Sequence, residues 1–244
     1  MNQFKQVKPT DFNNTNYNTT ISEFRELVDG KVVFFHPTAL EAIKIHKIHE
    51  SDILSHPYFN YVVVDGTVFI ITGFSKTNSS ISSALFFSNY KPKMAVLAGI
   101  AGAYAQTDLN IGDVVSVKTE YFVDESHINE KSIEMLNEIN LEITPNNKID
   151  FKTIDDLKIV NSNTISLIPT YNNLSDLYYN KTLADIENME GASFAAAASK
   201  FTSEFYEVRA ISNYCGEKAS QKWDIVNSSK NLKNEINNII EKYK

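Results

Sequence analysis

Short apolar runs alternate with stretches of helical spacing along the chain, and this pattern predicts a succession of strands and helices. Residues 32–35 (Val-Val-Phe-Phe) form the first apolar run, which predicts a buried strand that ends before Pro37, because proline cannot continue a strand ladder. Residues 38–49 then have helical spacing. A strand followed directly by a helix is typical of α/β proteins.

A hairpin follows, and the alternation then continues to the end of the chain. Residues 61–64 and 68–71 are apolar, and Asp65-Gly66 between them supplies the positive φ angles of a tight turn. Further helices are predicted over residues 79–90, 188–201 and 223–243, and further strands over residues 93–98, 114–117 and 207–211. Because these strands are too apolar to be half exposed, we predict a three-layer αβα fold with a central twisted mixed sheet.

Two polar regions interrupt this pattern. Residues 1–30 are rich in Asn and Thr, so we expect a polar N-terminal extension that adds little to the core, with one short helix over residues 22–28. Residues 125–160 are polar and irregular, and we expect one helix there, between residues 131 and 139. Residues 31–244 are expected to form one folded domain.

The composition favours a globular protein that binds a small molecule. The chain has 244 residues, no uninterrupted apolar stretch of about 18 residues and no secretory signal at its start, so we expect a cytoplasmic protein without a membrane partner. Its net charge of −7, with no cluster of Lys and Arg, argues against a nucleic-acid partner. Cys215 is the only cysteine, which excludes an internal disulfide and a thiolate metal cluster. We expect neither a metal nor another cofactor.

A glycine-containing segment follows one of the predicted strands. Residues 97–103 (Leu-Ala-Gly-Ile-Ala-Gly-Ala) lie at the carboxyl end of the strand, where open α/β sheets bind ligands, and the glycines Gly99 and Gly102 let the backbone approach a substrate closely. The glycine spacing is that of neither a dinucleotide-binding fingerprint nor a P-loop. A tight turn after the strand is the alternative interpretation.

A carboxylate at the start of a predicted helix forms a second candidate. Residues 188–194 (Asn-Met-Glu-Gly-Ala-Ser-Phe) place Glu190 beside small residues, and a carboxylate that accepts two hydrogen bonds matches a cis-diol such as the 2′ and 3′ hydroxyls of ribose. The alternative is an acidic residue that only complements the helix dipole.

A third candidate segment, residues 208–214 (Val-Arg-Ala-Ile-Ser-Asn-Tyr), ends a strand with polar side chains. Together with residues 72–76, 97–103, 111–115 and 188–194, it resembles the nucleoside phosphorylase and nucleosidase superfamily in motif order and spacing, over roughly residues 32 to 235. The C-terminal part, with Ile-Ser-Asn-Tyr at residues 211–214, Trp223 and Lys-Asn-Leu at residues 230–232, is more similar to the tail of futalosine hydrolases. The next resemblance is to methylthioadenosine/S-adenosylhomocysteine nucleosidases.

The resemblance implies a nucleoside phosphorylase-like fold and a purine nucleoside as substrate, with water attacking an oxocarbenium-like ribosyl cation. It implies that Glu41 activates the water, that Glu190 binds the ribose hydroxyls while Met189 packs against the sugar, and that Arg209 orients the water or its carboxylate partner. Ala101, Gly102 and Ser212 would contact the substrate. An exposed helical position for Glu41 and a structural salt bridge for Arg209 remain as alternatives.

Asn213 bears on the choice of base. Adenine-specific relatives carry aspartate here, which can give a proton to N7, whereas an asparagine amide can only donate hydrogen bonds, a pattern that suits N7 and O6 of a 6-oxopurine. The resemblance therefore favours hydrolysis of futalosine or a related nucleoside by a homodimeric enzyme. A methylthioadenosine/S-adenosylhomocysteine nucleosidase, a purine nucleoside phosphorylase and a catalytically silent nucleoside-binding protein remain as alternatives.

The chain also departs from the resembling family. The loop Ser-Gly-x-Gly-Lys is replaced by Thr72-Gly73-Phe74-Ser75-Lys76, which lacks the second glycine, and residues 165–173 contain Pro169 but no glycine. Residues 31–45 contain no arginine for a phosphate cradle, which favours hydrolysis over phosphorolysis.

Three further residues receive no role from the sequence. His46 and His49 are three residues apart on the predicted helix, without an acidic or cysteine partner, so we expect a solvated helix face rather than a metal site. Cys215 is expected to be a small buried side chain.

Overall fold

The computed structural model describes residues 15–139, 147–168, 172–216 and 222–243. The main sheet consists of β1 (Val32–His36), β2 (Leu54–Ser55), β3 (Asn60–Val64), β4 (Thr67–Ile71), β5 (Met94–Ala103), β6 (Val114–Tyr121), β9 (Lys148–Asp150), β10 (Lys158–Thr164), β11 (Ile186–Asn188) and β12 (Phe205–Tyr214). The helices are α1 (Thr15–Val28), α2 (Ala39–His46), α3 (Ser75–Asn89), α4 (Asn172–Thr182), α5 (Gly191–Ala198) and α6 (Ile225–Tyr243). The strand order is β11-β10-β6-β12-β5-β1-β4-β3-β2, with parallel and antiparallel pairs.

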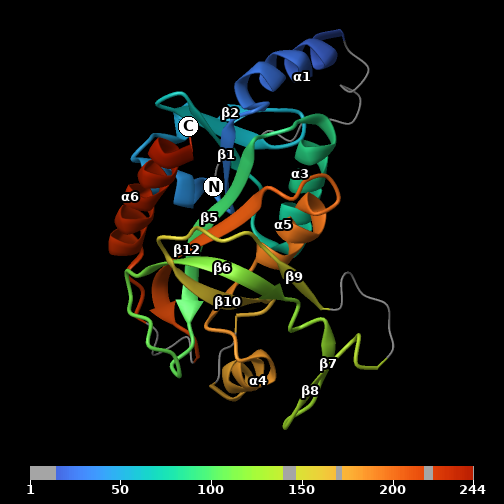
Figure 1. The fold of residues 1–244 in the computed structure, drawn as a ribbon, viewed down its shortest axis with the longest axis vertical. Coiled ribbons are helices and arrows are strands. Elements are labelled where there is room, and N and C mark those ends of the chain that lie inside the picture. Colours follow the sequence, from blue (N-terminus) through green and yellow to red (C-terminus); the bar gives the residue numbers. More distant parts are fainter. Residues whose placement is uncertain (1–14, 140–146, 169–171, 217–221, 244) are drawn as a thin grey trace.

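Helices cover both faces of this sheet, as the sequence predicts. Figure 1 shows α6 on one side of the central strands and α3 with α5 on the other. Successive residues of β1 point to opposite faces of the sheet. Phe35 packs against Phe86 of α3 and Phe194 of α5. Phe34 belongs to the core on the other face, which contains Leu232 of α6. The three-layer fold with a central mixed sheet is confirmed.

The sheet curls back on itself at one end. Strand β11 pairs parallel with β10 and antiparallel with β5, so β5, β12, β6, β10 and β11 form a closed circuit. In this circuit Gly102 of β5 lies opposite Glu187 of β11 on one side and Asn213 of β12 on the other. The register of β12 shifts between Ile211 and Asn213, which leaves Ser212 as the extra residue of a bulge.

Most predicted elements are present, with shifted ends. The hairpin is confirmed, with φ angles of 50° at Asp65 and 79° at Gly66. Strand β5 continues to Ala103, so the segment interpreted alternatively as a tight turn is extended strand. Helix α2 ends three residues before the predicted position, because Lys47 adopts a left-handed conformation with a φ of 56°.

The N-terminal segment contributes more to the core than expected. Helix α1 spans Thr15–Val28, so it begins seven residues before the helix predicted over residues 22–28. Phe24 and Val28 are buried against the aromatic residues of the core, which corrects the prediction that this segment adds little to it. Residues 1–14 of the predicted extension lie outside the described part.

The irregular region contains strands instead of the predicted helix. Strands β7 (Ser126–Ile128) and β8 (Ile133–Met135) pair as a small antiparallel sheet, so the helix predicted between residues 131 and 139 is wrong. The physical reason is a period of two: Ile133 and Met135 are buried while Glu134 between them is exposed. Residues 140–146 lie outside the described part.

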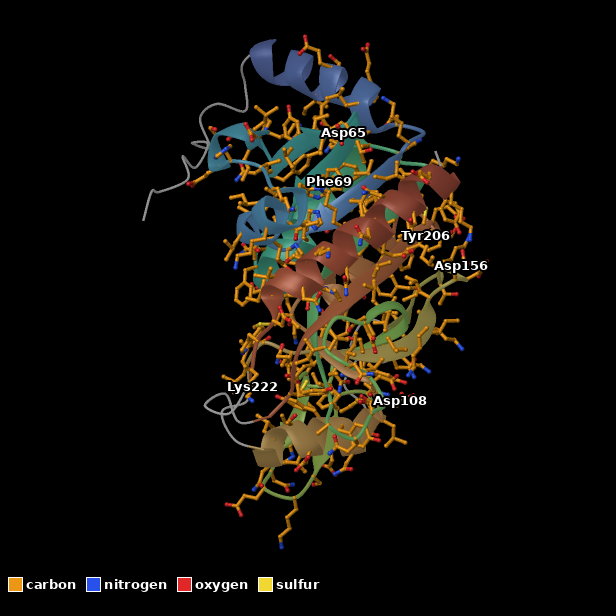
Figure 2. All side chains as sticks on the ribbon, turned by 90° about the vertical axis from the view of Figure 1, so that its left-hand side faces the viewer. Asp65, Phe69, Asp108, Asp156, Tyr206 and Lys222 are labelled. Carbon is orange, nitrogen blue, oxygen red and sulfur yellow. The ribbon has the colours of Figure 1, made fainter. Side chains whose placement is uncertain are left out.

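The two ends of the molecule are distinct. Figure 2 shows Asp65, in the β3–β4 turn, at the end that carries α1, and Lys222 toward the opposite end, near α4. Within the described residues, no helix has the length and apolar character required to cross a bilayer.

Candidate active site

A cavity of about 220 Å³ opens where β1, β5, β11 and β12 end or bend. Its walls include seven of the eight predicted site residues: Glu41, Ala101, Gly102, Met189, Glu190, Ser212 and Asn213. Arg209, the eighth, lies directly behind the wall. Residues that are far apart in the sequence therefore meet in one space, which lies at the sheet edge expected for a ligand site.

Glu41 is held in place by local structure. Thr38 caps helix α2, because its Oγ1 accepts a hydrogen bond from the Glu41 N–H at 3.1 Å and donates to Glu41 Oε2 at 2.8 Å. The Ile100 N–H donates to Glu41 Oε1 at 3.1 Å. Burial raises the pKa of Glu41, and the positive charge of Arg209 opposes this rise. The alternative of an exposed helical glutamate is wrong, since only 9% of Glu41 is accessible.

Glu190 occupies the N-cap position of α5, and its side chain lies in the cavity. Its Oε1 accepts a hydrogen bond from the Ser75 N–H at 3.3 Å, and its Oε2 lies 3.6 Å from Arg209 Nη2. Burial raises the pKa of Glu190 to about 7, although Arg209 lowers it, and the nearby charge of Glu41 raises it further. Two carboxyl groups with raised pKa values thus face the same end of the cavity.

Arg209 supports both carboxyl groups from within the protein. Its guanidinium is fully buried and donates from Nε to Glu207 Oε1 at 2.7 Å and from Nη1 to the Ile100 carbonyl at 3.3 Å. The salt bridge proposed as the alternative role is therefore present, together with the approach to Glu190. A Cβ at Gly99 would lie 2.5 Å from Arg209 Nη1 and 3.0 Å from Glu41 Oε1, so this strand position requires glycine.

A buried polar network extends below the cavity, and the sequence interpretation missed it. The Asn188 amide donates to Glu120 and Glu207, and the Thr164 hydroxyl donates to Glu120 Oε2 at 2.6 Å. Burial raises the pKa of Glu120, and burial together with the nearby charge of Glu120 raises the pKa of Glu207. The available signal was the pair of charged residues, Glu207 and Arg209, within the strand predicted over residues 207–211, since charged side chains are rarely buried without a partner.

The other end of the cavity carries amide and hydroxyl groups. Asn213 Oδ1 lies 2.8 Å from the Ser212 hydroxyl, and Asn213 Nδ2 donates to the Tyr214 carbonyl at 3.1 Å. A Cβ at Gly102 would lie 3.2 Å from Asn213 Nδ2 and 2.9 Å from Cys215 Sγ. Because Gly102 has no side chain, the Asn213 amide and the Cys215 thiol can lie directly over this position of the strand.

Glu187 lies at this same end and was also missed. It lines the cavity, is 7% accessible and lies opposite Gly102 in the β11–β5 pair. Burial raises the pKa of Glu187 to about 7, while hydrogen-bonding interactions with the Tyr104 hydroxyl and the Cys215 thiol lower it. Its position directly before the motif of residues 188–194 was the available signal.

The mouth of the cavity is apolar. Leu40, Phe74 and Trp223 line it and remain 58%, 51% and 45% accessible, and Ile165 and Ile168 extend the lining toward the region expected to meet the base. Pro169, which marks the departure in that region, lies outside the described residues.

The loop of residues 72–76, which departs from the motif of the resembling family, keeps backbone angles that are typical of glycine. Gly73 has a φ of 92° and Ser75 a φ of 84°, so Ser75 adopts a left-handed conformation at the position where the family motif has its second glycine. Lys76, the last residue of the motif, pairs with Asp124.

The two helical histidines differ from the predicted solvated face. His49 is exposed, but His46 is buried and lies with its Nε2 2.9 Å from His36 Nε2. His36 Nδ1 donates to the Ala98 carbonyl at 2.6 Å, so the Nε2 of His36 accepts from His46. Burial lowers the pKa of His36 to about 4 and that of His46 to about 3, so both rings are neutral at pH 7. Among the described residues, no group of three or more His, Cys, Asp or Glu side chains could hold a metal ion.

Comparison with known proteins identifies the fold. No protein-family model matches the chain. No curated protein sequence matches it either. Among solved structures, the 5′-methylthioadenosine/S-adenosylhomocysteine nucleosidase of Campylobacter jejuni aligns with a TM-score of 0.67 at 20% identity, covering 87% of this chain and 99% of its own.

Two further solved structures match to a similar extent. Native futalosine hydrolase of Helicobacter pylori aligns with a TM-score of 0.66 at 16% identity, covering 89% of this chain and 99% of its own. The corresponding methylthioadenosine nucleosidase of Colwellia psychrerythraea, in complex with adenine, aligns with a TM-score of 0.67 at 16% identity, covering 88% and 96%. The chain has the mixed α/β fold of these nucleoside phosphorylase-like nucleosidase structures.

Proposed function

We propose that the protein is an N-ribosyl hydrolase that cleaves purine nucleosides with water, and that its substrate is futalosine or a related 6-oxopurine nucleoside. One observation carries this proposal: a single cavity has Glu41, held by the Ile100 N–H, and Glu190 at one end, and at the other the Asn213 amide, which lies over Gly102 two residues further along β5. The first end suits a ribose and an attacking water, and the second suits a heterocyclic base.

Glu190 and Glu41, at the carboxyl end of the cavity, have different roles. Glu190, held by Ser75 and Arg209, accepts the hydrogen bonds of the ribose hydroxyls, with Met189 beside it packing against the sugar. Glu41 takes the proton of the attacking water, and its raised pKa brings its proton affinity closer to that useful for a general base. Arg209 orients these carboxyl groups and balances their charge without entering the cavity.

The amide end recognises the base. The Ser212 hydroxyl donates to Asn213 Oδ1, and this favours the amide orientation in which Nδ2 is the atom nearer to the space over Gly102. The N–H groups of Nδ2 can donate hydrogen bonds to N7 and O6 of a 6-oxopurine. Solved structures of similar fold include both a futalosine hydrolase and an adenine complex, so the base must be determined on this chain itself.

Turnover assays test the reaction and the base together. Purified protein is incubated with futalosine, inosine and methylthioadenosine, each with and without phosphate, and the free base is quantified. We expect phosphate-independent release of hypoxanthine, fastest from futalosine. Turnover that requires phosphate identifies a phosphorylase, and a preference for methylthioadenosine overturns the assignment of Asn213.

A substitution at the ribose end tests the role of Glu190. Glu190→Gln is expected to lower kcat/KM by at least about 10²-fold, because an amide cannot accept both ribose hydrogen bonds as a carboxylate does. The exposed Glu134→Gln serves as the control and should retain wild-type rates. Wild-type protein that binds purine nucleosides but releases no base would instead be a silent binding protein.

We further propose that the chain forms a homodimer. The exposed Leu40, Phe74 and Trp223 at the cavity mouth form an apolar rim that a second subunit could cover. Sedimentation velocity should then give twice the 27.6 kDa mass of one chain, and a monomer at micromolar concentration would contradict the proposal.

A further inference from the structure

Three strands bring an acid and an amide to either side of one glycine. In the β11–β5 pair Glu187 lies opposite Gly102, and in the β12–β5 pair Asn213 lies opposite the same glycine. Side chains directly opposite each other in a sheet project from the same face. Glu187 and Asn213 therefore flank the space over Gly102, and both line the cavity.

The environment of Glu187 is nearly closed to water but incompletely satisfied. Its Oε2 is buried and has no hydrogen-bond partner among the described residues. Its polar neighbours are the Tyr104 hydroxyl and the Cys215 thiol. The Asn163 amide donates to the Tyr104 hydroxyl at 3.0 Å, which leaves the Tyr104 O–H to point toward the carboxyl group. A buried carboxyl oxygen without a partner indicates an interaction that a ligand completes.

We propose that Glu187 is the general acid of this site, and that it gives a proton to a ring nitrogen of the purine as the glycosidic bond breaks. The proposal rests on the proposed nucleoside hydrolase and assigns a step that the sequence left open. Asn213 then binds and orients the base, while Glu187 supplies the proton that an amide cannot.

The step balances without a further reactant. The C1′–N9 bond breaks and its electron pair stays with the purine, while a purine ring nitrogen takes the proton of the Glu187 carboxyl group. Water forms the new bond to C1′ and loses a proton to Glu41. Glu187 ends as a carboxylate, Glu41 as a carboxylic acid, and solvent restores both after the neutral base leaves.

Glu187 is better suited to donate a proton than its two polar neighbours, Tyr104 and Cys215. An acid catalyst is most effective when its pKa lies near the working pH, and burial raises the pKa of Glu187 to about 7. Burial raises the pKa values of Tyr104 and Cys215 well above their usual values, and the charge of Glu187 adds to both shifts. The phenol and the thiol therefore hold their protons too strongly to act in place of the carboxyl group.

Two substrates distinguish proton donation from a structural role. A purine nucleoside that the wild type hydrolyses needs a protonated leaving group, whereas 4-nitrophenyl β-D-riboside releases a nitrophenolate that needs no proton. Glu187→Gln should lower kcat for the purine nucleoside by about 10²–10⁴-fold. The same variant should retain cleavage of the nitrophenyl riboside within about threefold of wild type, because it keeps the ribose end intact.

The pH profile gives a second readout. Wild-type kcat on the purine nucleoside should fall as the pH rises above 7, because the acid must be protonated, and this limb should be absent with the nitrophenyl riboside. Glu187→Asp, which keeps the acid on a shorter side chain, should recover part of the lost activity. Glu134→Gln, an exposed glutamate on β8, is the matched control and should change neither profile.

The outcomes separate this inference from the proposed function. Equal losses on both substrates in a folded Glu187→Gln protein, or a wild-type kcat that does not fall above pH 7, overturn the role of Glu187 and leave the hydrolase intact. If Glu187→Gln fails to fold, Glu187→Asp and the wild-type pH profile decide the question. A wild type that cleaves neither substrate overturns the hydrolase and this role with it.

Discussion

At the scale of single residues, Ser75 adopts a backbone conformation that glycine occupies at lower cost. Its φ of 84° lies in the left-handed region, where a side chain is strained, and its N–H faces Glu190. The loop geometry is therefore retained although the glycine of the resembling motif is absent. The strain supports a contact in the cavity, which explains why a conformation unfavourable for serine persists.

Restoring glycine here should stabilise the protein. Ser75→Gly is expected to raise the free energy of unfolding by about 0.5–1 kcal/mol, because relief of the strained φ exceeds the added entropy of the unfolded chain. Urea unfolding measures the effect. Ser80→Gly, also in α3 but with ordinary helical geometry, should lower the stability, and a loss of stability in both variants would show that Ser75 is not strained.

At the scale of elements, helix α1 is part of the core. Phe24 packs against the rings of Phe59, Tyr61 and Tyr90, with centroid separations of 4.8 to 5.6 Å. The polar composition of the segment conceals this role, because a single stripe of apolar residues is enough to attach a helix.

Truncating the buried ring should therefore affect the whole domain. Phe24→Ala is expected to destabilise the fold by about 3–5 kcal/mol, as expected for the loss of a buried phenylalanine. Leu27→Ala, three residues further along the same helix and 39% accessible, should cost much less. Thermal unfolding compares the two, and similar small losses would mean that α1 is only loosely attached.

The sequence predicts a feature well when a local pattern specifies it, and less well when its position depends on the pairing of strands that are distant in the sequence. The hairpin at Asp65 follows from two adjacent residues, and the segment around Glu190 is contiguous, so both were found. The position of Glu187 beside Gly102 depends on the antiparallel β11–β5 pair, which no local pattern specifies. His46 was misplaced for a different reason: its partner His36 is only ten residues earlier, at the end of β1, but the packing of α2 against the sheet brings the two rings together.

At the scale of the whole molecule, buried acids and buried histidines oppose each other in the pH dependence of stability. The lowered pKa values of His36 and His46 contribute stability that is present above pH 6.5 and lost as the pH falls through about 4 and 3. The raised pKa values of Glu187 and Glu190 contribute stability that is present below pH 4.5 and lost as the pH rises through about 7.

One substitution isolates the acidic contribution. Relative to wild type, Glu187→Gln should gain about 2–3 kcal/mol of unfolding free energy between pH 5 and pH 8, because only the wild type must ionise a buried carboxyl group. Urea unfolding of both proteins at the two pH values measures this difference. The gain should be absent in the exposed Glu134→Gln, and an equal difference at both pH values would show that Glu187 is already ionised at pH 5.

Strand β5 runs along the cavity from the carboxyl end to the amide end, so it fixes the distance between the two groups of side chains. The Ile100 N–H holds Glu41, and Asn213 lies over Gly102, two residues further along the same strand, a separation of ~7 Å along the backbone. An extended backbone tied to strands on both sides cannot shorten, so the strand acts as a ruler for the ligand. A ribose joined to a fused double ring spans such a length, whereas a nucleoside with a single-ring base falls short of one end. Pyrimidine nucleosides are therefore expected to be rejected by size before any difference in hydrogen bonding matters.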